Sequence, residues 1–275
     1  MNIGQKVSRA APWWILVGLL SAGCTVRSLI YPAPAIEVGE PPPGFEEVEL
    51  RSVGGERVIG WHHASTPATE RPAMVFFHGN GENLETLKWS GLFERLLSLQ
   101  APVLVVDYPG YGRSTGQPSE QSLMGAAAGA LAWMQERHPD RPLVPCGWSL
   151  GAALAVQLAA NEATGTVQGL IAISPWSSLR AVAEIHFPRW LVGVGLRESY
   201  DSLGVAGRIG VPTLVLHGAI DRIIPVEQGH QLAAAIVGAT WIQIETAGHN
   251  DVLGLEIVWQ EIDDFMSTLS QPTSL

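Results

Sequence analysis

Cysteine is scarce in this sequence, with only two among 275 residues. Cys24 ends an apolar N-terminal run and Cys146 lies in another apolar segment, so no disulfide framework is indicated. Basic residues are also few: the chain has 16 lysines and arginines, which are scattered along the sequence, and its formal net charge is -10. Binding to nucleic acid draws most of its affinity from clustered lysine and arginine, so the composition argues against nucleic acid as a partner.

Internal repeats and low-complexity tracts are missing as well, apart from one proline-rich stretch near the N-terminus. Apolar residues make up 47% of the chain, which is enough to bury one large core. Length and composition therefore predict a single α/β domain better than two small ones.

The N-terminal segment forms a unit of its own. Basic residues near the start are followed by an apolar stretch over residues 13–20 and by a small-residue segment that ends at Cys24. This order predicts an export signal over residues 1–23. An uncleaved N-terminal membrane anchor is the alternative, although the apolar stretch is shorter than the roughly 20 residues that a permanent span needs.

The end of this segment, Leu20-Ser21-Ala22-Gly23-Cys24, resembles a bacterial lipoprotein signal, with Leu20 displaced by one position from the usual large apolar residue. The resemblance implies that Cys24 is lipidated and becomes the mature N-terminus. The protein would then be a membrane-anchored lipoprotein of the cell envelope, since buried acyl chains make a stable anchor. Thr25, in place of an aspartate, resembles the outer-membrane sorting preference of some Gram-negative bacteria.

Residues 24–44 follow as a segment rich in proline. Such proline density predicts an extended, semi-stiff spacer between the lipidated N-terminus and the folded domain. We expect the domain itself over residues 45–270, followed by a short C-terminal tail at 271–275.

Apolar runs and helical stretches alternate along the domain. Two short runs around Gly54-Gly55 predict an opening β-hairpin, and the later apolar runs are typical of strands covered on both faces. The alternation predicts a mostly parallel, doubly wound sheet. The expected strands are 48–50, 57–61, 73–77, 103–106, 143–146, 170–173, 213–216 and 241–244, and the expected helices are 84–99, 119–137, 152–160 and 226–235.

A candidate nucleophile lies in the sequence Gly147-Trp148-Ser149-Leu150-Gly151, which follows an expected strand and opens an alanine-rich helix. A sharp turn between strand and helix needs very small residues beside the serine and leaves its hydroxyl exposed above the sheet. The Gly-x-Ser-x-Gly pattern alone is weakly specific, but its position between strand and helix predicts a nucleophile elbow at Ser149.

A serine hydroxyl needs a base within hydrogen-bond reach, and that base needs an acid to hold its tautomer. Four histidines follow Ser149 in the chain. His249 comes just after the last expected strand, where a loop would carry it to the carboxyl edge of the sheet, so we predict it as the base. His217 is interpreted as a packed structural histidine, and His186 and His230 as structural or exposed.

Asp221 is the predicted acid, because it follows the strand ending at Leu216 and lies between nucleophile and base in the chain order Ser, acid, His. A turn aspartate is the alternative interpretation of this residue. Asp201 is the second candidate for the acid. Asp251 is too near His249 in sequence to face its ring easily, and Asp107 precedes the nucleophile.

The oxyanion that forms during acyl transfer needs two hydrogen-bond donors. We predict the backbone N–H of Leu150, directly after the nucleophile, and the backbone N–H of Asn80, in the loop His78-Gly79-Asn80-Gly81 that follows an expected strand.

Residues 45–270 resemble the α/β-hydrolase superfamily, and more narrowly the Bem46-like and ABHD13/ABHD17-type serine hydrolases. The resemblance implies an α/β-hydrolase fold with a short cap, a triad of Ser149, Asp221 and His249, and no metal or organic cofactor. It rests on several motifs in order, which are 78–83 (HGNGEN), 107–114 (DYPGYGRS), 147–151 (GWSLG), 174–176 (SPW), 216–218 (LHG) with Asp221, and 248–249 (GH).

The substrate stays open at this stage, because one scaffold hosts many reactions. A serine at the elbow favours acyl transfer to water and predicts a carboxylesterase or thioesterase acting on a small-molecule acyl substrate. A serine peptidase or aminopeptidase of the same fold, and a tethered binding protein with an unused triad, are the alternatives. The aromatic segment of about residues 175–208 is expected either to form a small cap over an apolar acyl pocket or to pack over the sheet; its aromatic and large apolar residues are Trp176, Phe187, Pro188, Trp190, Leu191 and Leu196.

Overall fold

The computed structural model describes residues 28, 30–65, 70–161 and 165–270. The predicted signal at 1–23, the predicted lipidation site Cys24 and the tail at 271–275 lie outside these residues.

The described chain forms one eight-stranded sheet in the order β1-β2-β4-β3-β5-β6-β7-β8. The six strands from β4 to β8 in this order are parallel, while β2 is antiparallel to both β1 and β4. The mostly parallel, doubly wound sheet and the opening hairpin are therefore confirmed. The strands are β1 (Glu46–Arg51), β2 (Arg57–His63), β3 (Ala73–Phe77), β4 (Val103–Val106), β5 (Leu143–Trp148), β6 (Leu170–Ile173), β7 (Thr213–Gly218) and β8 (Thr240–Ile244).

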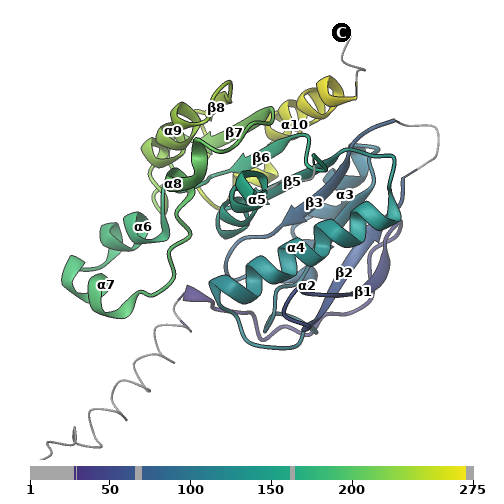
Figure 1. Cartoon of the computed structure of the whole chain (residues 1–275), viewed down its shortest axis with the longest axis horizontal. Helices are drawn as coiled ribbons and strands as arrows, with labels where there is room; N and C mark the ends of the chain where they lie inside the picture. The colour runs from purple at the N-terminus through teal and green to yellow at the C-terminus, as the bar shows by residue number, and fades with distance from the viewer. Residues whose placement is uncertain (1–27, 29, 66–69, 162–164, 271–275) are drawn as a thin grey trace, which may run out of the picture.

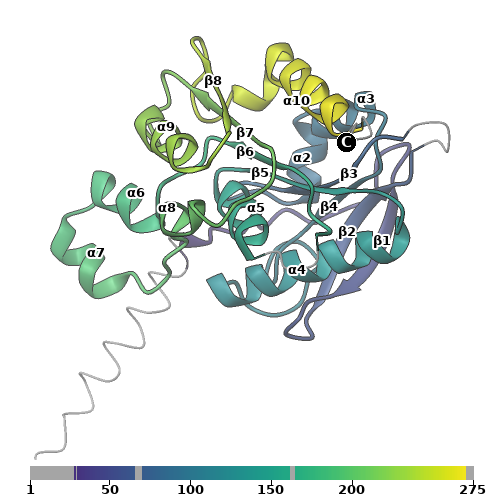
Figure 2. The ribbon, with the colours of Figure 1, turned by 45° about the horizontal axis from the view of Figure 1, so that its top comes forward.

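Helices cover both faces of the sheet and enclose two separate apolar cores (Figures 1 and 2). On one face lie α4 (Glu120–Arg137), α5 (Leu150–Asn161), α8 (Ser202–Ala206) and α9 (Val226–Ala235). On the other lie α2 (Leu84–Trp89), α3 (Leu92–Ser98) and α10 (Glu256–Leu269). Every side chain of β3 and β4 is buried, as expected for strands covered on both sides.

Two helices differ from the sequence-based prediction. The single helix expected at 84–99 is divided into α2 and α3, because Gly91 adopts a left-handed conformation with φ of 77° between them. Helix α10 was not among the expected helices. Its buried side chains Val258, Trp259, Ile262 and Met266 recur at helical spacing, so an amphipathic pattern was present in the sequence.

The proline-rich segment also differs from the expected free-standing spacer. Between Tyr31 and Gly44 it has neither helix nor strand, but it lies against the domain, where Tyr31 and Val38 are buried. The Tyr31 hydroxyl is 2.8 Å from that of Tyr200, and the Asn83 side chain donates to the carbonyl of Ile36. Burial of these apolar side chains holds the segment on the protein surface.

A pair of short helices, α6 (Leu179–His186) and α7 (Arg189–Gly195), projects from the carboxyl edge of the sheet (Figures 1 and 2). Leu179 and Val182 of α6 pack against the core on the α4 and α5 face, and Val192 is the one residue of the two helices that is buried. Helix α8, which ends the predicted cap region, instead packs against α5 and α9.

Candidate active site

Ser149 lies at the turn between β5 and α5, with a positive φ of 57°. The flanking glycines are required by close packing. A Cβ on Gly147 would lie 2.1 Å from the carbonyl oxygen of Gly151, and a Cβ on Gly151 would lie 1.9 Å from that of Phe77. Any larger side chain at either position would open the turn, so the local sequence forces the strained geometry that presents the serine.

His249 reaches Ser149 from the loop after β8. Its Nε2 atom lies 3.0 Å from the Ser149 Oγ, and both side chains are buried. The imidazole ring packs beside the indole of Trp148, with a centroid separation of 5.3 Å. A histidine at this distance is placed to take the proton of the serine hydroxyl.

Asp221 lies on the loop after β7, on the other side of the same imidazole. Its Oδ2 atom is 2.7 Å from the Nδ1 atom of His249. The Oδ1 atom accepts the backbone N–H groups of Ile223 and Ile224, each at 2.8 Å. The loop therefore holds one carboxylate oxygen and leaves the other directed at the histidine.

The charge of Asp221 is strongly favoured. Burial by itself raises the pKa of this carboxyl, but hydrogen bonds from His217 and His249 and from the Ile224 backbone outweigh it, so that the pKa lies well below its usual range. An ionised Asp221 can orient His249 and stabilise its imidazolium form.

The other acid candidates lie elsewhere. Asp201 caps α8, with its Oδ1 atom accepting the N–H of Gly204 at 2.9 Å. Asp251 accepts the N–H of Gly248 at 2.6 Å. Asp107 is buried under the loop after β3. Each of these carboxylates has another partner, and Asp221 is the carboxylate that lies within hydrogen-bond distance of His249 in the described part of the chain.

His217 is buried, as expected for a packed structural histidine, but it also contacts the predicted acid. Its Nε2 atom lies 2.9 Å from the carbonyl oxygen of Ile224 and 3.3 Å from the Asp221 Oδ2. A Cβ on Gly229 of α9 would lie 2.2 Å from the other ring nitrogen, so the ring fits only because this helix position is a glycine. The chain order of Ser, acid and His contained no signal for this contact.

Asn80 and Leu150 both line the cavity beside Ser149. Leu150 begins α5, so its N–H is one of those at a helix N-terminus that no helical carbonyl accepts. Such groups favour negative charge, and they suit an oxyanion. A Cβ on Gly79 would lie 2.6 Å from the Trp148 ring, so the loop can approach the elbow only with glycine there.

Two tyrosines from the loop after β4 hold the loop that carries Asn80. The Tyr111 hydroxyl donates to the Asn80 side-chain oxygen at 3.1 Å, and the Tyr108 hydroxyl donates to the His78 carbonyl at 2.7 Å. The ring of Tyr108 also stacks on that of His78, with centroids 4.1 Å apart. Residues 107–114 thus border the site and position the predicted oxyanion loop through the two hydroxyl groups.

Two carboxyl groups are buried behind the same loop. Burial raises the pKa of Asp107 to about 7, although its Oδ1 atom accepts the Leu84 N–H at 3.0 Å. Burial likewise raises the pKa of Glu82 to about 7. Both groups therefore change charge near neutral pH, whereas Asp221 stays ionised there.

An apolar cavity of about 740 Å³ opens above Ser149 and His249. Its walls come from the elbow, from α6 and α7, and from Ile30 at the start of the described chain. Of the six cap residues singled out in the sequence, four line this cavity, namely Trp176, Phe187, Leu191 and Leu196. Pro188 and Trp190 do not line it, and Trp190 is 73% exposed, so neither of the two expected roles, lining a pocket or packing over the sheet, holds for that tryptophan.

No group of three or more His, Cys, Asp and Glu side chains within the described residues is arranged to hold a metal ion. None of the helices described between residues 28 and 270 has the length and apolar character of a membrane span.

Comparison with known proteins agrees with this architecture. A family model described as alpha/beta hydrolase fold matches residues 72–194. An uncharacterised Mycobacterium tuberculosis protein, Rv2307c, is 31% identical over 258 residues, which cover 90% of both chains. The protein bem46 of Schizosaccharomyces pombe is 27% identical, covering 81% of this chain and 77% of its own.

Lysophosphatidylserine lipase ABHD12 of Rattus norvegicus is 28% identical over 182 residues, which cover 60% of this chain and 45% of the lipase. Among solved structures, the Pyrococcus furiosus esterase Pf2001 superposes with a TM-score of 0.70 over 87% of this chain and 99% of its own, at 16% identity. At that identity the likeness concerns the fold.

Proposed function

Since this chain belongs to the α/β-hydrolase family and is related to Bem46 and the ABHD-domain proteins, we propose that it is a serine hydrolase of apolar acyl esters or thioesters. The observation that carries the proposal is the line of hydrogen bonds from Ser149 through His249 to Asp221 at the floor of an apolar cavity. Nucleophile, base and acid within hydrogen-bond reach of one another are the requirement for nucleophilic acyl transfer.

In the proposed reaction, His249 takes the proton of the Ser149 hydroxyl as the oxygen attacks the carbonyl carbon of the substrate. The backbone N–H groups of Leu150 and Asn80 stabilise the oxyanion of the tetrahedral intermediate. His249 then gives its proton to the departing alcohol or thiol, and an acyl-enzyme is left on Ser149. Water, activated by the same histidine, releases the carboxylic acid. Asp221 stays ionised throughout and stabilises the imidazolium.

The cavity supports an apolar acyl group as the recognised part of the substrate. Its walls are formed mainly by aliphatic and aromatic side chains, including Leu179, Val182 and Leu191. Such a lining accepts a hydrocarbon chain, whereas the peptide groups of an extended polypeptide would lose their hydrogen bonds there. A relative that is a lysophosphatidylserine lipase is consistent with this preference. Ester or thioester hydrolysis is therefore favoured over peptide hydrolysis.

A fluorophosphonate probe and a panel of acyl esters, thioesters and peptides test the proposal. Ser149→Ala should abolish probe labelling and lower kcat on the best ester by several orders of magnitude, because the nucleophile is removed. Ser174→Ala is the matched control. Ser174 also has a positive φ, of 46°, and it is buried at the end of the neighbouring strand β6. The control should label and turn over normally.

Failure of the folded wild-type protein to react with the probe would favour the tethered binding protein instead. Turnover of peptides faster than of esters would favour the peptidase.

We further propose that the protein is anchored to a membrane of the cell envelope through a lipid on Cys24. The proposal rests on the order of basic, apolar and small residues before Cys24 in the sequence. In cells that process lipoproteins, wild-type protein should carry acyl mass on its N-terminal cysteine, and Cys24→Ala should carry none. An unmodified mature wild-type protein would contradict the proposal, even if it sediments with membranes.

A further inference from the structure

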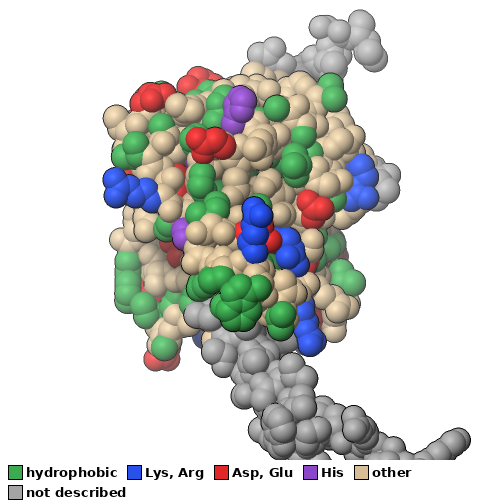
Figure 3. All heavy atoms as spheres, turned by 90° about the vertical axis from the view of Figure 1, so that its left-hand side faces the viewer, with side chains coloured by type: hydrophobic (Ala, Val, Ile, Leu, Met, Phe, Trp, Pro, Cys, Tyr) green, Lys and Arg blue, Asp and Glu red, His purple; other side chains and the backbone are tan. Residues whose placement is uncertain are grey.

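The projecting helices α6 and α7, with the residues that join them, expose several large apolar side chains to solvent. These side chains are Ile185, Phe187, Trp190, Leu191 and Val194, and together they are called the outer apolar face here. Trp190 is 73% exposed and Val194 is 80% exposed. Figure 3 views the molecule from the side on which α6 and α7 project, and apolar side chains gather low on that face. Five such residues within ten positions are typical of an interaction surface, whereas scattered single residues are not.

We infer that the outer apolar face docks into the surface of a phospholipid bilayer and opens the cavity toward it. A helix that lies in a membrane interface has one apolar face with tryptophan or phenylalanine and basic residues beside it. Helices α6 and α7 have this composition, with Phe187 and Trp190 on the apolar face and Arg180 and Arg189 next to it.

The charge of the pair differs from that of the whole protein. The chain has a formal net charge of -10, but α6 and α7 contain two arginines and a single acidic residue, Glu184. Glu184 lies 3.5 Å from Arg180 and 3.3 Å from Arg189, so it is shared by both cations. The side chain of Arg189 is 85% exposed, so its guanidinium can approach a lipid phosphate while it stays near Glu184. This is the local balance that an anionic bilayer surface attracts.

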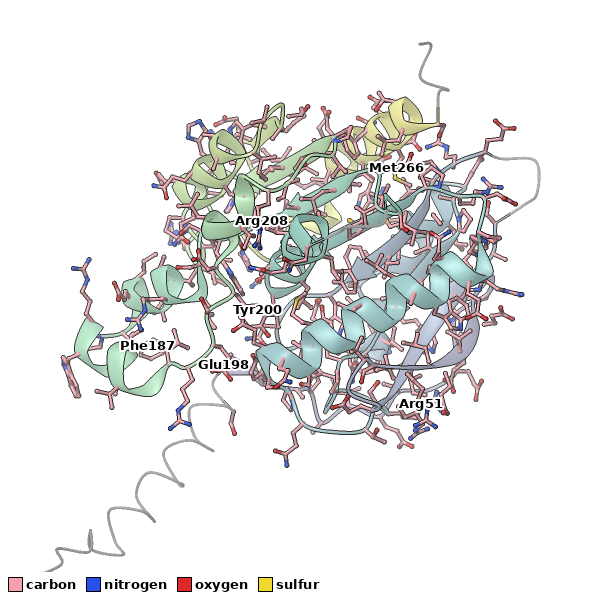
Figure 4. The ribbon with its side chains drawn as sticks, in the orientation of Figure 1. Arg51, Phe187, Glu198, Tyr200, Arg208 and Met266 are labelled. Atoms are coloured by element: carbon pink, nitrogen blue, oxygen red, sulfur yellow. The ribbon has the colours of Figure 1, made fainter. Side chains whose placement is uncertain are left out.

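The chain itself enters the domain beside this helix pair. The Tyr31 hydroxyl forms a hydrogen bond with that of Tyr200, which follows α7 in the chain and is labelled in Figure 4. Ile30, directly before Tyr31, lines the cavity. Tyr31 comes seven positions after Cys24. No conformation of seven residues spans more than about 25 Å. A membrane anchor at Cys24 would therefore keep the end of the domain that carries α6 and α7 close to the bilayer.

The outer apolar face is continuous with the cavity. Phe187 and Leu191 belong to both, since they line the cavity and are 47% and 44% exposed. Ile223, on the loop after Asp221, also lines the cavity and is 42% exposed. Phe187 is labelled on the projecting pair in Figure 4. A hydrocarbon chain can thus pass from the bilayer to Ser149 along apolar side chains. This route rests on the proposed hydrolase activity, whereas the docking does not.

A fluorescent label at the outer apolar face tests the docking. The full chain with Cys24→Ser and Val194→Cys is labelled with an environment-sensitive dye, while Cys146 stays unreactive because it is buried. The probe is a vesicle of phosphatidylcholine and phosphatidylglycerol in equal parts, with or without brominated acyl chains. The controls carry the label at Val53→Cys or Val237→Cys, which are 78% and 89% exposed but lie outside the helix pair.

On vesicles, the dye at position 194 should shift to the blue and be quenched several-fold more by brominated lipid than the dye at either control position. Trp190→Ser in the same chain should reduce this quenching. Ser149→Ala should leave it unchanged, so the outcome does not depend on catalytic activity.

Equal, water-like emission at all three positions in protein that floats with the vesicles would overturn the inference. A blue shift at position 194 that appears without vesicles and grows with protein concentration would also overturn it, because a second copy of the chain would then cover the face.

Discussion

His217 and His249 contact the same carboxylate oxygen from different elements. The Oδ2 atom of Asp221 lies 2.7 Å from the Nδ1 atom of His249 and 3.3 Å from the Nε2 atom of His217. His217 belongs to β7, the strand that precedes the loop with Asp221, whereas His249 comes from the loop after β8. The acid is thus contacted by a histidine of the sheet while it orients His249 from the side opposite Ser149. The first two predictions concern this arrangement.

Asp221→Asn should lower kcat on an activated ester by a large factor, on the order of 10⁴-fold, as the same change does in another Ser-His-Asp enzyme. The amide keeps the shape of the side chain but cannot stabilise the imidazolium of His249. Asp201→Asn is the matched control, because Asp201 only caps α8. A normal kcat for the Asp221 variant, with a collapse in the Asp201 variant, would show that the acid is misassigned.

His217→Phe should reduce kcat roughly tenfold and leave KM nearly unchanged, because Asp221 loses one of the donors that orient it. The same loss raises the pKa of Asp221 toward its ordinary value. A carboxyl with a depressed folded-state pKa stabilises the fold above its unfolded pKa, and that stability disappears as the pH falls through the folded value. Acid unfolding of the variant, followed by near-ultraviolet circular dichroism, should therefore begin at higher pH than in wild type.

His217→Gln offers an amide donor in place of the ring N–H and should recover part of both effects. His230→Gln is the control, because His230 is exposed to solvent. If His217→Phe lowered stability equally at all pH values and left kcat intact, the residue would only fill space.

Tyr111→Phe should lower kcat several-fold with little change in KM. The hydroxyl donates to the Asn80 side chain at 3.1 Å, and its loss frees the loop that carries one of the two proposed oxyanion donors. Steady-state kinetics on one ester would separate the two constants. Tyr31→Phe removes a hydroxyl that bonds to Tyr200 and should leave kcat unchanged. Equal effects of both substitutions would mean that Tyr111 acts through general stability.

Asp107→Asn should stabilise the protein increasingly as the pH rises from about 4 to about 7. Burial raises the pKa of Asp107 to about 7, so the folded state holds a proton that the unfolded state has released across this range. Wild-type stability therefore falls with pH in that window, and the amide avoids the loss, which is on the order of a few kcal/mol for a shift of this size. Urea unfolding at about pH 4 and about pH 8 would measure the difference.

The exposed Asp140→Asn should show no such dependence on pH. A constant difference between the Asp107 variant and wild type across the range would mean that Asp107 is already ionised in the fold.

Local patterns in the sequence determined the main elements and the order of the predicted site. Strands such as β3 and β4 are marked by continuous apolar runs, because their residues are buried on both faces. The elbow is marked by its glycines, because Gly147 and Gly151 must approach neighbouring carbonyl groups closely. Parallel strands end at one edge of the sheet, so residues that follow β5, β7 and β8 were expected to meet there, and Ser149, Asp221 and His249 do meet.

Only the tertiary structure decided which further residues join them. His217 reaches Asp221, Tyr111 reaches Asn80, and Trp190 faces outward while Leu191 lines the cavity. The position of Tyr31 against Tyr200 likewise brings the proline-rich segment onto the domain. The contacts of Tyr111 and Tyr31 join segments far apart in the chain, and the exposure of Trp190 depends on the rotation of a short helix about its axis. The contact of His217 spans only four positions, but it depends on how the loop after β7 folds back. Packing across the whole domain determines them, and no periodicity or local motif encodes packing at that range.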